Sequence, residues 1–320
     1  MAPCCTPFTK FDCNSMVHIS VVVPVYRESL NLPALYARLS SVLDTIGRSY
    51  EIILVDDGSP DNSWDVMKSL GPNTICVKLS RNFGHQLAVT AGLQRAKGQA
   101  VVIIDADLQD PPELIAEMLE LHDSGYHVVY AQRKERKGEG WVKRTTAKIF
   151  YRVLNRLTNI RIPVDTGDFR LIDQCVVREL NAMPEATKFL RGQIAWLGFK
   201  QVAVFYDRDP RSHGETGYTL RKMLNLAIAG ITGFSDQPLR IVTRLGISIS
   251  LVSGLLVLYA LFQHFVAKAT ITGWTSLILS VAFFGGIQLL SIGIIGEYVA
   301  RIHGNVLGRP TVVVEDEVRS

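Results

Sequence analysis

The chain of 320 residues lacks several patterns that would assign it to common protein classes. It has no clustered stripe of basic residues: its formal net charge is +4 and acids and bases are interspersed, so nucleic acid is not an expected partner. No internal repeat is visible, and residues 1–16 lack the apolar core of a signal peptide, so they are predicted to be a disordered leader. The cysteines follow neither a zinc-binding nor a disulfide spacing, as expected in a reducing compartment: Cys4, Cys5, Cys13, Cys76 and Cys175.

Formal charge is also absent from two long apolar segments near the C-terminus. Leu245–Ala267 would rise about 34 Å as a helix, enough to cross a hydrocarbon layer of about 30 Å. Ala269–Gly296 is the second uncharged segment, with Trp274 and Tyr298 near its ends, where aromatic rings lie at membrane interfaces. We predict two transmembrane helices within residues 241–302, joined by a short turn. The alternative is a buried helical hairpin in a soluble core.

The basic residues around these segments predict their orientation. The turn between the two segments offers only Lys268, whereas four arginines flank the outer ends: Arg240, Arg244, Arg301 and Arg309. Because positive charge favours the cytosolic side, we expect the N-terminal part and a tail of residues 303–320 in the cytosol. Residues 219–240 mix basic and apolar residues and are predicted as amphipathic juxtamembrane helices, with a soluble surface helix as the alternative.

The N-terminal part alternates β-branched segments with segments of helical periodicity. Strands are predicted at 18–26, 50–56, 74–80, 100–105, 127–132 and 201–206, and helices at 30–46, 63–70, from 85, after 112 and near 141–158. This order predicts an α/β domain over residues 17–218, with a mainly parallel sheet and helices on both faces. Ligands bind such sheets at the carboxyl ends of the strands, and a loop from Arg133 to Gly140 is placed to cover that edge.

Two adjacent carboxylates, Asp56 and Asp57, follow the predicted strand at 50–56. At the ligand edge of the sheet they can accept hydrogen bonds from the NH of a base and from a ribose hydroxyl. The alternative is an ordinary turn and helix cap, for which Asp-Gly-Ser is also typical.

A second acidic group follows the predicted strand at 100–105. Residues two apart in extended backbone point to the same side, so Asp105 and Asp107 can converge on one hard cation, with the amide oxygen of Gln109 as a third ligand. Mg²⁺ or Mn²⁺ bound in this way would take its other ligands from phosphate oxygens and water. Solvated acids in a turn are the alternative. Pro111 and Pro112 then set where the next helix begins.

Five ordered motifs resemble those of the family 2 glycosyltransferases of GT-A fold, which is Rossmann-like. They are Val23–Glu28, Asp56–Ser59, Ser80–Gln86, Asp105–Pro112 and Gly167–Leu171. Within that family the chain is similar, from Ile19 to Pro310, to polyprenyl-phosphate glycosyltransferases such as bactoprenol glucosyltransferases and dolichyl-phosphate mannose synthases.

The resemblance implies a reaction and a cellular location. The expected reaction is inverting transfer of a hexose from a nucleotide sugar to a polyprenyl-phosphate lipid, with UDP-glucose expected first and GDP-mannose second. The expected enzyme is metal-dependent, using Mg²⁺ or Mn²⁺, and is an integral protein of the cell inner membrane with its catalytic domain in the cytosol. A homo-oligomer, a tetramer by resemblance, is also implied.

The same likeness assigns site residues. Those expected to bind the nucleotide sugar are Pro24, Tyr26, Glu28, Asp56, Asp57 and His85, and those expected to hold the metal are Asp105, Asp107 and Gln109. The resemblance also implies that Arg133, Arg144 and Arg211 surround the lipid phosphate, which suits their chemistry because guanidinium groups bind phosphate bidentately. Solvated surface arginines are the alternative. Where relatives usually carry a lysine before Tyr218, this chain has Gly217.

Asp168 is the catalytic base that the resemblance suggests, beside Asp105 and Asp107 as catalytic residues. A phosphate monoester is mostly dianionic at neutral pH, however, and can attack without losing a proton. Asp168 can instead orient the acceptor, bind a sugar hydroxyl, or pair with Arg170 or another arginine of the site. Two other functions compete: a processive polysaccharide synthase, whose Gln-x-x-Arg-Trp motif is incomplete at Gln193–Trp196, and a non-catalytic nucleotide-sugar-binding membrane scaffold.

Overall fold

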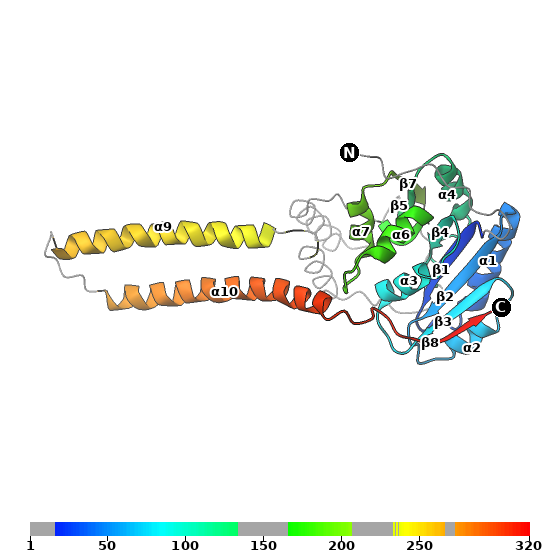
Figure 1. Ribbon diagram of the computed structural model, residues 1–320, viewed down its shortest axis with the longest axis horizontal. Helices are drawn as coiled ribbons and strands as arrows, with labels where there is room; N and C mark the ends of the chain where they lie inside the picture. The colour runs from blue at the N-terminus through cyan, green and yellow to red at the C-terminus, as the bar shows by residue number, and fades with distance from the viewer. Residues whose placement is uncertain (1–16, 134–165, 207–232, 234, 236, 266–272) are drawn as a thin grey trace. The chain divides into compact units, whose positions relative to one another are not determined.

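A computed structural model describes residues 17–133, 166–206, 233, 235, 237–265 and 273–320 (Figure 1). The chain divides into two compact units, which are described separately. The first comprises residues 1–144, 162–217 and 310–320, and the second comprises residues 145–161 and 218–309.

An eight-stranded sheet forms the centre of the first unit, in the order β7-β5-β6-β4-β1-β2-β3-β8. Strand β1 pairs in parallel with β2 and β4, β2 with β3, and β5 with β7, whereas β6 and β8 pair antiparallel with their neighbours. The strands are β1 Ile19–Val25, β2 Tyr50–Asp56, β3 Thr74–Leu79, β4 Ala100–Ile103, β5 Val128–Arg133, β6 Thr166–Asp173, β7 Gln201–Tyr206 and β8 Val314–Arg319. The prediction of an α/β domain with a mainly parallel sheet is confirmed.

Helices cover both faces of this sheet, as predicted. The helices are α1 Leu32–Ile46, α2 Ser63–Lys68, α3 His85–Leu93, α4 Leu114–Asp123, α6 Gln174–Ala182 and α7 Leu190–Leu197. Buried residues of α1, α2 and α4 pack on one face, and buried residues of α3, α6 and α7 pack on the other. Neighbouring residues of β1 show this alternation, since Val21 and Val23 face the first cluster and Val22 faces the second.

Two strands of the sheet were not predicted from the sequence. Strand β6 runs antiparallel between β4 and β5, and β8, in the segment predicted as a tail, runs antiparallel to β3 at the edge of the sheet. Strand β4 is also shorter than predicted, because it ends at Ile103 and a turn follows at Ala106 and Asp107. The argument that Asp105 and Asp107 share a side in extended backbone is therefore wrong, since the chain turns between them.

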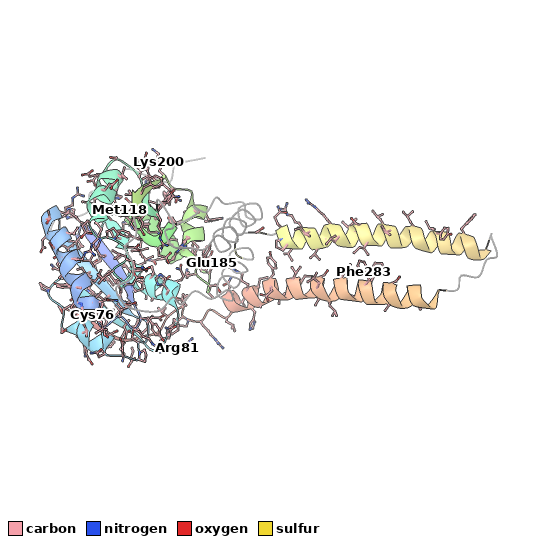
Figure 2. All side chains as sticks on the ribbon, turned by 180° about the vertical axis from the view of Figure 1, so that it is seen from behind. Cys76, Arg81, Met118, Glu185, Lys200 and Phe283 are labelled. Carbon is pink, nitrogen blue, oxygen red and sulfur yellow. The ribbon has the colours of Figure 1, made fainter. Side chains whose placement is uncertain are left out.

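Two long helices, α9 Gln237–Phe265 and α10 Trp274–Val306, lie side by side in the second unit (Figure 1). The hydroxyl of Tyr298 on α10 donates to the backbone oxygen of Ser235, 2.7 Å away, just before α9. Large apolar side chains project from both helices, as Phe283 does in Figure 2, and Phe283 is 62% exposed. This exposure among the described side chains does not fit the alternative of a hairpin buried in a soluble core.

One segment of the described residues, Phe283–Val306 in α10, is long and apolar enough to cross a membrane. The crossing of a membrane by two helices therefore stays a prediction. Four predicted features lie wholly or mostly outside the described residues. They are the leader of residues 1–16, the helix near 141–158, the turn after Lys268 and most of the amphipathic segment 219–240.

Candidate active site at the carboxyl edge of the sheet

The carboxyl ends of β1, β2 and β4 meet at one edge of the sheet, and the start of β6 lies at the same edge. The antiparallel register of β4 and β6 pairs Ile103 with Arg170. Two residues further out, that register leads to Asp105 from one strand and Asp168 from the other. The topology of the sheet thus brings together two carboxylates that are 63 positions apart in the sequence.

Asp57 holds the loop Ser80–Gly84 against the end of β2. Its carboxylate accepts hydrogen bonds from the backbone amides of Phe83 at 2.7 Å and Gly84 at 2.9 Å. Gly58 makes this approach feasible: it has a φ of +65°, and a Cβ there would lie 2.5 Å from the backbone carbon of Arg81. Burial raises the pKa of Asp57, although the two backbone amides oppose the shift.

Asp56 is fully buried beside it. One carboxylate oxygen accepts a hydrogen bond from the amide of Ser59 at 3.0 Å, and the other has no hydrogen-bond partner among the described residues. Burial raises the pKa of this carboxyl group. The hydrogen bond with Ser59 agrees with the alternative that Asp56 belongs to an ordinary turn. The other carboxylate oxygen is still available to accept a hydrogen bond from a ligand.

The residues at the carboxyl end of β1 form another part of the site. Pro24 is the partner of Val55 in β2 and lies beyond the last β1 residue that pairs with β4. Tyr26 is 41% exposed, and the guanidinium of Arg27 lies 5.3 Å from its ring centroid. Glu28 accepts a hydrogen bond from the side chain of Asn31 at 2.6 Å. An exposed aromatic face beside buried acceptors is suited to a base and a ribose.

The acidic turn after β4 has the features of a cation site. The Oδ1 atom of Asp105 is buried without a hydrogen-bond partner among the described residues, and it lies 3.7 Å from Nε2 of His85. Burial and the charges of nearby carboxylates, Asp107 among them, raise the pKa of Asp105 to about 6, although His85 opposes the shift. A cation would relieve this accumulation of negative charge.

Asp107 and Gln109 are both buried in that turn. The amide of Gln109 donates a hydrogen bond to Oδ1 of Asp107 at 3.2 Å, and Leu108 between them has a φ of +59°. Within the described residues, no three His, Cys, Asp or Glu side chains are grouped to hold a metal. The carboxylate and amide oxygens of this turn are donors of the kind that a hard cation prefers.

Asp168 is bound by side chains from two helices. Its Oδ1 lies 2.8 Å from Nε of Arg191 on α7, and its Oδ2 lies 3.0 Å from Nε2 of His85 and 3.3 Å from the amide nitrogen of Gln86 on α3. Gln86 also accepts a hydrogen bond from the backbone amide of Leu190, the first residue of α7. Asp168 therefore links both helices to the start of β6.

These contacts determine the charge state of the cluster. Burial alone would raise the pKa of Asp168, but Arg191 and His85 hold it well below its usual range. Burial would lower the pKa of His85, but the hydrogen bond that its ring donates to Asp168 and the charges of Asp105 and Asp168 raise it to about 9. An anionic carboxylate that is engaged on both oxygens is a poor proton acceptor at neutral pH.

Arg133, at the end of β5, lies near the start of β6, since a Cβ on Gly167 would be 4.0 Å from its Nη2. Beside it, the hydroxyl of Tyr206 on β7 donates a short hydrogen bond to Asp110. Burial and the charge of Asp110 raise the pKa of Tyr206, whereas Arg133 lowers it. The two other arginines predicted to bind the acceptor phosphate, Arg144 and Arg211, lie outside the described residues.

The structure therefore brings together Asp105, His85 and Asp168, while Asp56 and Asp57 lie at the end of β2 in the same sheet edge. Sequence reasoning missed Arg191 as a partner of Asp168, although it left open a pairing with another arginine of the site. It also missed Gln86, which lies in a quoted motif. Burial and pairing distinguish these residues, and neither is visible in a single sequence.

The sheet is mainly parallel, helices cover both of its faces and carboxylates gather at its carboxyl edge, which is the GT-A architecture expected from the motifs. Residues 20–180 match the family model described as glycosyl transferase family 2, and the chain belongs to this family.

Relatives match over nearly the full chain. An uncharacterized glycosyltransferase, YkcC of Bacillus subtilis, is 47% identical over 93% of this chain and 94% of its own length. The prophage bactoprenol glucosyl transferase homolog of Escherichia coli is 36% identical over 93% of this chain and 98% of its own. The bactoprenol glucosyl transferase of Shigella phage SfII is 36% identical over 94% and 98%. Among solved structures, glucosyl-3-phosphoglycerate synthase of Mycobacterium tuberculosis matches at 19% identity over 68% of this chain and 78% of that chain, with a TM-score of 0.47.

Proposed function

We propose that the protein transfers a hexose, with inversion, from a nucleotide sugar to a polyprenyl phosphate at the cytosolic face of a membrane. UDP-glucose is the proposed donor, because relatives at 36% identity are named bactoprenol glucosyl transferases. The observation that carries the proposal is the acidic turn at Asp105, whose buried Oδ1 has no hydrogen-bond partner among the described residues and lies 3.7 Å from His85, which also contacts Asp168. That arrangement suits a cation-bound diphosphate leaving group next to a positioned acceptor.

In the proposed site, Asp105, Asp107 and Gln109 would hold Mg²⁺ or Mn²⁺, which would supply positive charge to neutralise the departing diphosphate. The nucleotide lies along the ends of β1 and β2, where the ring of Tyr26 is exposed and Asp57 orders the following loop. Pro24, Glu28 and Asp56 complete the nucleotide pocket.

The acceptor phosphate is bound by Arg133, together with Arg144 and Arg211. One of its oxygens attacks the anomeric carbon, a new carbon–oxygen bond forms, and the bond to the nucleoside diphosphate breaks with its electron pair on the leaving oxygen. Because the attacking oxygen carries no proton at neutral pH, no base is required. The paired state of Asp168 supports a role in orienting the acceptor or a sugar hydroxyl.

A membrane assay tests this function. The full chain in native membranes receives radiolabelled UDP-glucose, UDP-galactose or GDP-mannose together with undecaprenyl phosphate, and chloroform-soluble label is counted. We expect label from UDP-glucose that disappears on chelation and returns with Mn²⁺ or Mg²⁺. Label from GDP-mannose alone would replace the proposed donor with that of a dolichyl-phosphate mannose synthase type of enzyme. Absence of lipid-linked product with every donor would favour the non-catalytic scaffold.

A further inference from the structure

The last strand of the chain, β8, lies directly beside the loop that contains part of the candidate site. Strand β8 pairs antiparallel with β3, and just before it the backbone oxygen of Val313 accepts a hydrogen bond from the amide of Ser80 at 3.0 Å. At the other end, the amide of Ser320 donates to the oxygen of Thr74 at 3.0 Å. The C-terminal segment therefore binds β3 from its first residue to the start of the Ser80–Gly84 loop.

Side chains add to this attachment. Val312 and Val314 pack against the same core cluster as Phe83 of the loop and the buried residues of α3. Glu317 pairs at 2.8 Å with Nε of Arg95, which follows α3, and Glu315 pairs at 3.1 Å with Lys78 of β3. Strand β8 is thus fixed to both elements that border the loop.

The loop passes this support on to the site. Its amides at Phe83 and Gly84 hold the carboxylate of Asp57, and the next residue, His85, contacts Asp168 and Asp105. A continuous series of contacts therefore runs from the C-terminal strand through Ser80 to Asp57, which is proposed to bind the nucleotide, and to Asp105 in the acidic turn.

We propose that β8 is a positioning element for nucleotide binding: it holds the Ser80–Gly84 loop in the conformation that presents Asp57 and His85. This inference rests on the proposed function for the identity of the nucleotide, but not for the coupling itself. A strand that only covered the edge of the sheet would protect β3 without affecting the loop.

The test compares two proline variants of the full chain in detergent. The amide of Ser320 faces β3, so the alternation of an antiparallel ladder directs the amide of Asp316 toward β3 and that of Arg319 away from it. Asp316→Pro should therefore break the pairing beside Ser80. Arg319→Pro is the control for the backbone, and Arg319→Ala accounts for the pair that the Arg319 side chain makes with Glu317 at 3.0 Å. Hydrogen exchange of residues 80–84 and the affinity for uridine diphosphate with Mn²⁺ are measured in all three.

For Asp316→Pro we expect exchange at residues 80–84 about tenfold faster and binding of uridine diphosphate about fivefold weaker, with peptides of β1 and α4 unchanged. Arg319→Pro should match Arg319→Ala, which loses the same pair with Glu317 but keeps the backbone amide. If exchange in the loop and affinity are both unchanged in Asp316→Pro, the proposal is overturned.

Two further outcomes separate the coupling from the proposed function and from unfolding. If the wild type does not bind uridine diphosphate, the proposed donor fails, while the exchange data still decide whether β8 orders the loop. If Asp316→Pro exchanges fast everywhere, Glu317→Ala replaces it, because it removes the pair with Arg95 and leaves the ladder intact. Faster exchange confined to residues 80–84 in that variant supports the proposal, and an unchanged exchange rate there refutes it.

Discussion

At the scale of single residues, Asp105 and Asp168 differ in how the protein satisfies them. Among the described residues, the buried Oδ1 of Asp105 has no hydrogen-bond partner and lies 3.7 Å from Nε2 of His85, whereas Asp168 is engaged on both oxygens. We predict that Asp105→Ala lowers turnover to below about one-thousandth of the wild-type rate, the effect of removing a group that stabilises charge in the transition state. Asp168→Asn should retain measurable turnover at pH 8, because a dianionic acceptor needs no base. Equal inactivity of both variants, with folding and donor binding intact, would contradict this ranking.

Arg191 tests whether the pairing of Asp168 matters to the reaction. The two groups are 20% and 15% exposed, so little water is available to replace the guanidinium. Arg191→Ala should lower kcat by about tenfold or more, as expected for removing a residue that orients a site group, and Arg191→Lys should restore part of it. Arg178→Ala, an exposed arginine on α6, is the control and should be neutral. Steady-state rates with saturating donor provide the measurement; a neutral Arg191→Ala would show that this pair has no part in turnover.

At the scale of elements, the residue that caps the N-terminus of α6, Asp173, should make the free energy of unfolding depend on pH. Asp173 accepts hydrogen bonds from the amide of Cys175 at 2.7 Å and from His122 at 2.9 Å. Burial opposes the shift, but His122 and Cys175 lower the pKa of Asp173 to about 2 from an unfolded value of 3.8. The stabilisation, about 2 kcal/mol, is therefore present above pH 3.8 and lost as the pH falls toward 2.

Asp173→Asn measures this contribution. The melting temperature of the variant should lie below that of the wild type at pH 6, and the gap should narrow as the pH falls from 4 to 2.5. A gap that is constant over this range would show that the carboxylate charge of Asp173 does not carry the effect.

Elements with a simple periodic pattern could be predicted from the sequence. The observed bounds lie within two residues of the expected ones for β1, β2, β3, β7 and α1. The strands could be predicted because buried parallel strands are continuous apolar runs. Strand β6 was missed because it carries Asp168 and Arg170 in the sheet, and β8 because its three consecutive acids, Glu315–Glu317, are typical of a solvated tail.

The candidate site could be predicted only in part from the sequence. Carboxylates that directly follow strands, such as Asp57 and Asp105, could be assigned to the ligand edge from their positions. The contacts of Asp168 with His85 and Arg191 depend on the antiparallel insertion of β6 and on α7, so no spacing in the sequence indicates them.

At the scale of the whole molecule, the connectivity of the sheet restricts how the chain can cross a membrane. Strands β7 and β8 belong to one sheet, and α9 and α10 lie between them in the sequence. A sheet cannot be divided by a bilayer, so the number of crossings between β7 and β8 must be even. The apolar segment of α10 meets the length and composition needed to cross, and α9, about 43 Å long for its 29 residues, is the available partner.

Labelling with a membrane-impermeant maleimide tests this topology in a variant without native cysteines. Ala269→Cys, in the predicted turn between the helices, should react only from outside intact cells. Ser320→Cys, at the end of β8, should react only in inverted vesicles, because both ends of an even-crossing hairpin lie on the side of the sheet, which we expect to be the cytosol. If both positions react from the same side, α9 and α10 do not form a spanning pair. The acceptor would then have to leave the bilayer to reach Asp105, and delivery of a lipid phosphate by lateral diffusion would have to be abandoned.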